Sequence, residues 1–559
     1  MIRTHRRSWL QRVQSPVASH RLCRGLCRGL YGALALTLSL ATSTTSRAED
    51  VPPVYTAYPP AAVITTHSIS INGREIHYEA EAGTIALVDG KRSETARIFY
   101  IAYRMLERSP AEHAKLIAAF EADPAGGIWP TNEPARATRP ITFSFNGGPG
   151  SSSVWLHLGI FGPRRIDFAD QDGRPGPPPF ALTDNEASLL DVTDFVFIDP
   201  VSTGYSRASE GTEARDFHGV DSDIDSIAEF IRRVLTRERR WSSPKFIAGE
   251  SYGTTRASGL ADALWQQHGI ALNGVILISS ILDFGTVRTA IGNDLAYAMH
   301  VPTFTAIAHH HQMLAADLQA RPIFEVLKDA RHFVRASYAG ALLAGDALEE
   351  GERNRIVAGL ERFTGLSRDF LIRSRLRVDQ SSFCKELLRS RGLTVGRLDG
   401  RFTGRDRDDA GNRPEFDPSY AAIRGNFTAG LNAYVREELG FLSDLPYEIL
   451  GGIGGWDYGR GAENRFLNVA DRLRRAMHEQ PCLKVFVASG TTDLATPFGA
   501  AEHVFSHLGL ADELRANITM ELYDAGHMMY IDADERARLS ADLRTFINAS
   551  TPPANRGGE

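Results

Sequence analysis

The fold is indicated most clearly by an apolar run that ends in Gly-x-Ser-x-Gly, Phe246-Ile247-Ala248-Gly249-Glu250-Ser251-Tyr252-Gly253. A strand that turns sharply into a helix needs glycines beside the turn residue, since the crowded backbone leaves no room for a Cβ. Such a turn presents the hydroxyl of its serine at the edge of a sheet, so Ser251 is the candidate nucleophile. The same pattern also arises by chance in a glycine-rich chain. Whether Ser251 is catalytic therefore depends on whether the sequence also offers a base and an acid to act with it.

Strand-like and helix-like segments alternate around this stretch. Buried strands are predicted at residues 140–145, 195–198 and 275–279, and residues 221–233 space their apolar side chains as a helix does. This alternation predicts an α/β fold with a mainly parallel central sheet flanked by helices. The first of these strands ends in Asn146-Gly147-Gly148-Pro149-Gly150, where small residues leave backbone N–H groups free to bind an anion.

The chain before residue 140 predicts a β-meander and a loop. Alternating apolar residues at 66–71 and 74–78 flank Asn72-Gly73, which is typical of a β-hairpin, and residues 95–103 predict a third strand. Residues 109–137 are polar and helix-prone but are interrupted by Pro and Gly, so we expect a surface loop there.

The pattern changes after about residue 284, where the chain becomes mostly helical and rich in Arg. Strands resume at residues 483–488 and 518–523. We therefore expect an α/β core at 49–284 and 451–550, an inserted helical cap at 285–450 that roofs the active site, and a flexible tail at 551–559. The run His309-His310-His311 in the cap is not expected to bind a metal. Successive helical side chains point about 100° apart, so three in a row cannot converge on one ion.

The first 48 residues contain eight Arg and no Asp or Glu, and an apolar stretch precedes Ser46-Arg47-Ala48. This arrangement predicts a signal peptide at 1–48 and an exported protein, periplasmic or secreted, although an organellar transit peptide shares the basic, acid-free composition. The apolar stretch is shorter than the roughly 20 residues that span a bilayer, so no stable membrane anchor should remain after cleavage.

Removal of that leader takes away eight positive charges and changes the formal net charge from −6 to −14. A mildly acidic protein without a basic run is not expected to bind nucleic acid. Cys23 and Cys27 leave with the leader, so Cys384 and Cys482 remain. They are either one disulfide or two free thiols, because sequence does not place their Cα atoms.

A serine nucleophile requires a base and an acid that orients the base, in the chain order Ser, Asp or Glu, His for this class of fold. Asp493 follows the strand at 483–488 and His527 follows the strand at 518–523. Both therefore lie at the edge of the sheet that carries Ser251, and the three form the candidate triad. Asp524 is the alternative acid, but it directly precedes the His527 loop and has little freedom to orient the imidazole.

Together these motifs resemble the serine carboxypeptidase family, which has the α/β-hydrolase fold. The matching segments are Asn146-Gly147-Gly148-Pro149-Gly150, Asp199-Pro200-Val201 with Gly204-Tyr205-Ser206, Gly249-Glu250-Ser251-Tyr252-Gly253, Gly490-Thr491-Thr492-Asp493 and Gly526-His527-Met528. The resemblance implies that Ser251, Asp493 and His527 form the triad. It also implies that the N–H groups of Gly148 and Tyr252 stabilise the oxyanion, and that Asn146, Gly147 and Glu250 hold the free carboxylate of a substrate.

Glu250 and a substrate carboxylate can share a hydrogen bond only if one of them is protonated, so we expect peptidase activity to favour acidic pH. Four residues, at three places in the chain, depart from the family pattern. Ser151 replaces a usual Cys, Ser144 replaces a Trp that commonly contacts the carboxylate, and Met529-Tyr530 replace a small apolar residue and Pro.

The sequence thus predicts a serine-type carboxypeptidase that acts on peptide or protein C-termini and needs no cofactor. An esterase or acyltransferase with the same triad is the alternative, and Glu250 discriminates, because a neutral ester has no carboxylate for it to hold. A catalytically silent binding protein on the same fold is a third interpretation.

Overall fold

The computed structural model describes residues 62–109, 111–112, 115–116, 118–119 and 138–552, and everything below concerns these residues. The predicted leader, most of the predicted loop at 109–137 and the tail from residue 553 lie outside them. Ten strands form the main sheet, nine of them in the order β1-β2-β3-β7-β4-β9-β10-β13-β14, with β8 paired to β3. Their bounds are β1 (Ala62–Ile71), β2 (Arg74–Val88), β3 (Glu94–Leu106), β4 (Ile141–Phe145), β7 (Asp194–Ile198), β8 (Arg207–Ala208), β9 (Lys245–Glu250), β10 (Gly274–Ile278), β13 (Lys484–Gly490) and β14 (Ile518–Tyr523).

The amino-terminal strands form the predicted meander. Strands β1 and β2 pair antiparallel around the Asn72-Gly73 turn, and β3 pairs antiparallel with both β2 and β7. Strand β2 continues ten residues beyond the predicted end at Tyr78, to Val88. The sequence obscured this extension because Glu79 and Glu81 look like surface residues, yet both are buried beside a cation described below.

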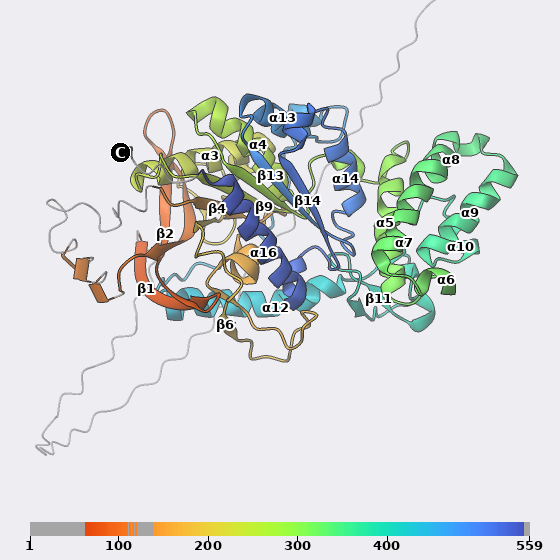
Figure 1. Ribbon diagram of the computed structural model, residues 1–559, viewed down its shortest axis with the longest axis horizontal. Helices are drawn as coiled ribbons and strands as arrows, with labels where there is room; N and C mark the ends of the chain where they lie inside the picture. Colours follow the sequence, from red (N-terminus) through yellow and green to blue (C-terminus); the bar gives the residue numbers. More distant parts are fainter. Residues whose placement is uncertain (1–61, 110, 113–114, 117, 120–137, 553–559) are drawn as a thin grey trace, which may run out of the picture. The chain divides into compact units, whose positions relative to one another are not determined.

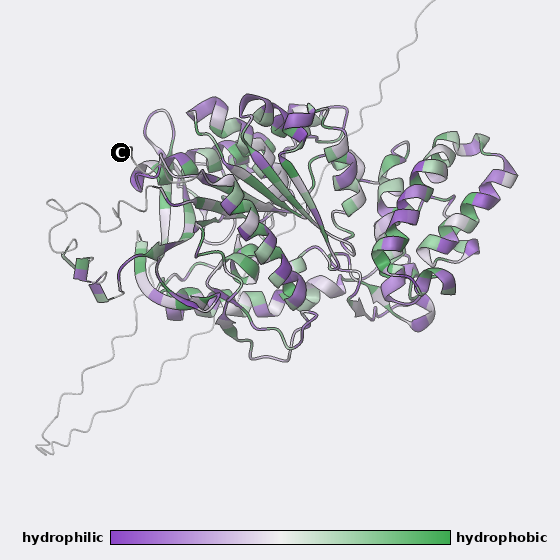
Figure 2. Ribbon diagram, in the orientation of Figure 1, coloured by the Kyte–Doolittle hydropathy of each residue, from purple (hydrophilic) through white to green (hydrophobic). Residues whose placement is uncertain are grey.

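The six strands β7, β4, β9, β10, β13 and β14 are parallel to one another, and helices cover both faces of this part of the sheet. Alternate residues of one strand enter opposite cores, since side chains alternate along a strand. On β9, Phe246 and Ala248 pack in one core and Ile247 in the other. Helices α3 (Val220–Arg237), α4 (Tyr252–His268) and α13 (Ala470–Glu479) cover the face of Ile247, and α16 (Ala533–Ser550) covers the opposite face. Figure 2 shows the resulting apolar strands between helices of mixed polarity.

A mostly helical insert lies between β10 and β13. Helices α5 to α10 gather beside α14 (Phe498–Ser506) in Figure 1, and most of their apolar side chains form a core of their own. The helices of the insert include α5 (Leu295–His310), α6 (Ala316–Gln319), α7 (Ile323–Phe333), α8 (Ala339–Ala344), α9 (Glu350–Thr364), α10 (Arg368–Arg373), α11 (Gln380–Glu386) and α12 (Pro418–Ala433). The strands β11 (Thr394–Val395) and β12 (Thr403–Gly404) form a separate pair.

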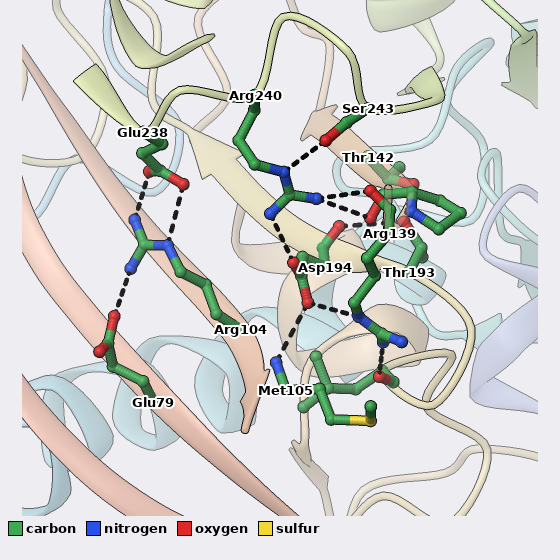
Figure 3. Close-up of polar contacts among 12 residues, drawn as sticks. Glu79, Arg104, Met105, Arg139, Thr142, Thr193, Asp194, Glu238, Arg240 and Ser243 are labelled. Atoms are coloured by element: carbon green, nitrogen blue, oxygen red, sulfur yellow. Dashed lines mark hydrogen bonds and ion pairs between the residues drawn. The ribbon is translucent and has the colours of Figure 1, made fainter. Parts of the chain in front are cut away.

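Buried ion pairs join the meander to the parallel sheet at the amino ends of the parallel strands (Figure 3). Arg104 on β3 lies 2.9 Å from Glu79 and 2.7 Å from Glu81, and it also pairs with Glu238 after α3. Nearby, Asp194 at the start of β7 accepts hydrogen bonds from Arg240 at 2.7 Å and from Arg139 at 2.8 Å. The network lies at the edge opposite Ser251, so its contribution is to stability.

Cys384 is buried and Cys482 is exposed, and both are free thiols. Among the described residues, no three His, Cys, Asp or Glu side chains are grouped as a metal site would require. None of the helices within the described ranges has the length and apolarity needed to cross a bilayer.

Candidate active site

Ser251 occupies the sharp turn between β9 and α4, with the positive φ of +60° that such a turn imposes. Its N–H donates to the carbonyl of Ile278 on the neighbouring strand at 3.0 Å. A Cβ on Gly249 would lie 2.2 Å from the carbonyl oxygen of Gly253, so the backbone at this turn excludes any side chain there. The turn therefore presents the Ser251 hydroxyl at the carboxyl end of the central strand, as the sequence predicts.

His527 and Asp493 meet at the same edge of the sheet. The Nδ1 atom of His527 donates to Oδ2 of Asp493 at 2.7 Å. Asp493 also accepts hydrogen bonds from the N–H groups of Ala495 at 2.8 Å and Thr496 at 3.1 Å, and from the Thr496 hydroxyl at 2.6 Å. Asp524, the alternative acid, instead accepts from the Thr491 hydroxyl at 3.0 Å. The geometry thus assigns the orienting contact to Asp493.

The electrostatics of this pair follow from its contacts. Burial alone would raise the pKa of Asp493, but His527 and the hydrogen bonds to Thr496 lower it overall. Burial alone would lower the pKa of His527, but the adjacent Asp493 carboxylate raises it overall, with a further contribution from Glu250. Asp493 is therefore ionised and stabilises a positive charge on the imidazole, which a general base needs when it accepts a proton.

A cavity of about 270 Å³ brings the candidate residues together. Its walls include Ser251 and His527 with Asn146, Gly147, Gly148, Glu250 and Tyr252. Asp493 is buried behind His527 and does not line the cavity. The insert contributes Val287, Arg288, Gln380, Arg397, Leu398, Tyr420, Ile423 and Leu450 to the walls.

The two candidate oxyanion donors, the N–H groups of Gly148 and Tyr252, belong to residues that line the same cavity as Ser251. Tyr252 is the first residue of α4, where a backbone N–H has no acceptor within the helix and the helix dipole favours negative charge. A Cβ on Gly147 would lie 2.4 Å from this nitrogen, so only glycine leaves the approach open. Gly148 follows with φ +103° and lines the same cavity. The site can thus place backbone donors around an oxygen that gains negative charge.

Glu250 and Asn146 form the candidate carboxylate-binding side of the cavity. Burial raises the pKa of Glu250 to about 7, while His527 and the Tyr530 hydroxyl favour its ionised form to a smaller extent. Asn146 accepts a hydrogen bond from the Leu156 N–H at 3.1 Å. Its amide nitrogen is buried and makes no well-formed hydrogen bond within the described chain. A carboxyl that can be neutral and an amide that interacts with it are therefore next to each other beside the nucleophile.

A segment of the insert, residues 397–401, contacts the loops that carry the candidate triad residues Asp493 and His527, and sequence reasoning missed it. The Leu398 carbonyl accepts from the His527 N–H at 2.7 Å, and the Gly400 N–H donates to the Thr492 carbonyl at 3.0 Å. Asp399 is buried and accepts from the Thr492 hydroxyl at 2.8 Å. These contacts join positions 92 to 129 residues apart, and no local motif predicts them.

Two further supporting residues concern the loop after β4. Arg256 on α4 is buried, pairs with Asp223 at 2.8 Å and donates to the backbone carbonyl of Asn146 at 2.6 Å. Ser151, which stands where the resembling family has Cys, accepts from the Trp155 indole at 2.8 Å. Next to it, the Gly451 N–H donates to the Gly150 carbonyl at 2.8 Å. Hydrogen bonds thus fix this loop without a disulfide.

An elbow serine, a histidine paired with a buried aspartate and the mainly parallel sheet define a serine hydrolase of the α/β-hydrolase fold. Residues 129–318 match the family model described as serine carboxypeptidase, and this match confirms the resemblance for that part of the chain. No curated protein matches the chain in sequence.

Several solved structures share the fold at low similarity. Proline iminopeptidase from Mycobacterium smegmatis is 12% identical, with 87% of this chain and 99% of that chain covered and a TM-score of 0.31. A carboxyl esterase from Bacillus coagulans is 11% identical, with 84% and 99% covered and a TM-score of 0.34. Monoglyceride lipase from Saccharomyces cerevisiae is 10% identical, with 84% and 97% covered and a TM-score of 0.32. Likeness at this level bears on neither substrate nor mechanism.

Proposed function

We propose that the protein is a serine-type carboxypeptidase that removes the C-terminal residue of peptides. The observation that carries the proposal is Glu250, a buried carboxyl beside the nucleophile with a pKa raised to about 7. A group of this kind is mostly protonated on the acid side of neutrality, when it can donate a hydrogen bond to a substrate carboxylate. The buried amide nitrogen of Asn146, which lies next to Glu250, offers a second donor for the same carboxylate.

In the proposed reaction, the Ser251 oxygen attacks the carbonyl carbon of the last peptide bond while His527 accepts the hydroxyl proton. The N–H groups of Gly148 and Tyr252 stabilise the resulting oxyanion, and Asp493 stabilises the imidazolium. His527 returns the proton to the leaving amine, which departs as the free C-terminal residue. Water then attacks the acyl-enzyme, and the same groups release the shortened peptide.

The proton requirement sets the pH dependence. Glu250 must hold a proton to receive the substrate, whereas His527 must be neutral to act as a base. Hydrolysis of a free-carboxylate substrate should therefore fall as the pH rises through about 7, where Glu250 ionises and repels the substrate. A substrate without that carboxylate should not show this fall.

The deciding experiment compares an N-blocked dipeptide that has a free C-terminus with the same dipeptide as its C-terminal amide, at mildly acidic pH. We expect clear preference for the free acid, no effect of a chelator, and complete loss in a Ser251→Ala preparation that excludes contaminating enzymes. Equal rates on the acid and the amide would reject the carboxypeptidase, and faster turnover of simple esters than of either would favour the esterase or acyltransferase.

We also propose that the protein is exported with cleavage after Ala48. N-terminal sequencing of the protein recovered outside the cytoplasm should then begin at Glu49.

A further inference from the structure

Tyr530 is a buried residue that contacts Glu250 and has no role in the triad. It lies three positions after His527, in the short 3-10 turn Met529–Ile531, and its side chain is fully buried. Its hydroxyl donates to Oε2 of Glu250 at 2.5 Å. Glu250 is the last residue of β9, so this bond links the loop after His527 to the residue before the nucleophile.

The surroundings of Tyr530 leave its ring little freedom. A Cβ on Gly159 would lie 2.2 Å from Cε2 of the ring, so the ring fills the space that a side chain at position 159 would need. At its backbone, the Tyr530 carbonyl accepts from Arg536 at 3.2 Å. Ring and backbone are thus both fixed, which directs the hydroxyl at Glu250.

A small residue on β4 leaves space on the same face of the sheet. Phe143 and Phe145 pack in the core on the α4 side, whereas Tyr530 packs in the opposite core. Because side chains alternate along a strand, Ser144 faces the core of Tyr530. A bulky residue at position 144 would occupy volume in the layer where the tyrosine ring lies.

We propose that Tyr530 is a positioning residue that decides which oxygen of Glu250 carries the proton offered to the substrate. The proposal rests on the carboxypeptidase function. By donating to Oε2, the hydroxyl makes that oxygen an acceptor, and the single proton of neutral Glu250 then lies on Oε1. Glu250 lines the cavity and its Oε2 is already bound to Tyr530, so under this proposal Oε1 is the oxygen that meets the substrate. Without the hydroxyl, the proton can occupy either oxygen and the carboxyl group can rotate.

The charged groups around Glu250 define the sign of the expected pH shift. Burial opposes the ionisation of Glu250 most strongly and Asp493 opposes it further, whereas His527 and the hydrogen bonds from Tyr530 and Asn146 favour it. Removing the hydroxyl takes away a donor to the ionised form, so the pKa of Glu250 should rise. The alkaline fall in peptidase activity should therefore move to higher pH even though binding of the substrate becomes weaker.

The test is a Tyr530→Phe enzyme, which keeps the ring and loses only the hydroxyl. Its kinetics would be measured on the free-acid and amide dipeptides from about pH 5 to about pH 9, a span that brackets both limbs of a bell-shaped profile. For the acid substrate we expect KM to rise about three- to tenfold with kcat nearly unchanged. The alkaline midpoint should rise by up to about one pH unit. The amide substrate should show neither change.

A Gly159→Ala enzyme provides a second variant, because its methyl group would displace the ring without touching the hydroxyl or Glu250. It should raise KM for the acid substrate in the same direction. If the wild type prefers the free acid but Tyr530→Phe keeps its KM and its alkaline midpoint, the role of Tyr530 is refuted and the carboxypeptidase stands. If the wild type shows no preference for the free acid, the proposed function fails and the role of Tyr530 fails with it.

Discussion

Replacing Glu250 by Gln tests the carboxylate hypothesis directly, because glutamine is nearly isosteric and cannot ionise. With a pKa of about 7, wild-type Glu250 is about nine-tenths protonated at pH 6 and about one-tenth protonated at pH 8. The kcat/KM for the free-acid substrate should accordingly fall about tenfold between these two pH values. In the Glu250→Gln enzyme this fall should disappear, since the amide donates a hydrogen bond to the substrate at any pH.

The electrostatic repulsion in the wild type is large enough for the full fall to be observed. Two carboxylates about 4 Å apart repel each other by about 4 kcal/mol at an effective dielectric constant of about 20, which corresponds to about a thousandfold in affinity. At any pH up to about three units above the pKa of Glu250, almost all turnover therefore comes from enzyme molecules in which Glu250 is neutral. The tenfold fall is set by the titration of Glu250 and not by a limit on the repulsion.

Initial rates on the free-acid and amide dipeptides across the pH range would provide the measurement, with the amide as an internal control that responds to His527 alone. Because Glu250 helps to raise the pKa of His527, the substitution should also move the acid limb of both substrates to slightly lower pH. A Glu250→Gln enzyme that kept the wild-type alkaline fall on the acid substrate would refute the reasoning.

Two further predictions concern residues that act through others. Asp399→Asn weakens the acceptor for the Thr492 hydroxyl. We expect kcat to fall about tenfold with KM nearly unchanged, because small misplacements of catalytic groups are costly. An unchanged kcat with a lower free energy of unfolding would limit the role of Asp399 to folding. Arg104→Met removes the buried cation that Glu79, Glu81 and Glu238 share, while Glu81 keeps its ion pair with Arg237, and this loss should lower the free energy of unfolding in urea by about 3–5 kcal/mol. The exposed pair of Arg97 provides the control, since Arg97→Met should cost less than about 1 kcal/mol.

The elbow and the parallel sheet could be predicted because short-range patterns determine them. The apolar run before Gly249 has the composition of a strand buried on both faces, and the backbone crowding at the turn requires glycine whatever the rest of the chain does. The order Ser251, Asp493, His527 follows from strand ends that the sequence also marks. Each of these predictions needs only a few neighbouring residues.

The remaining features depend on contacts between distant segments. Glu79 and Glu81 give β2 the pattern of a half-exposed strand, and their burial is explained by Arg104 on the next strand and, for Glu81, also by Arg237 at the end of α3. The hydrogen bonds of residues 397–401 to the triad loops likewise require the path of the whole insert. The sequence shows Tyr530 only as a departure from a family pattern. Its contact with Glu250 could not be predicted, because it spans 280 positions.

Under the proposed function, the substrate helps to create its own general base. Glu250 and His527 influence each other's pKa, so a single proton can lie on either of them. On His527 that proton is stabilised by Asp493 and by ionised Glu250, and the enzyme is then inactive. A substrate carboxylate that binds beside Glu250 raises the pKa of Glu250 more strongly than the pKa of His527, because Glu250 is nearer to it. The proton then moves to Glu250 and leaves the imidazole neutral. An amide or ester has no such charge, and the same site therefore discriminates against it in kcat as well as in binding.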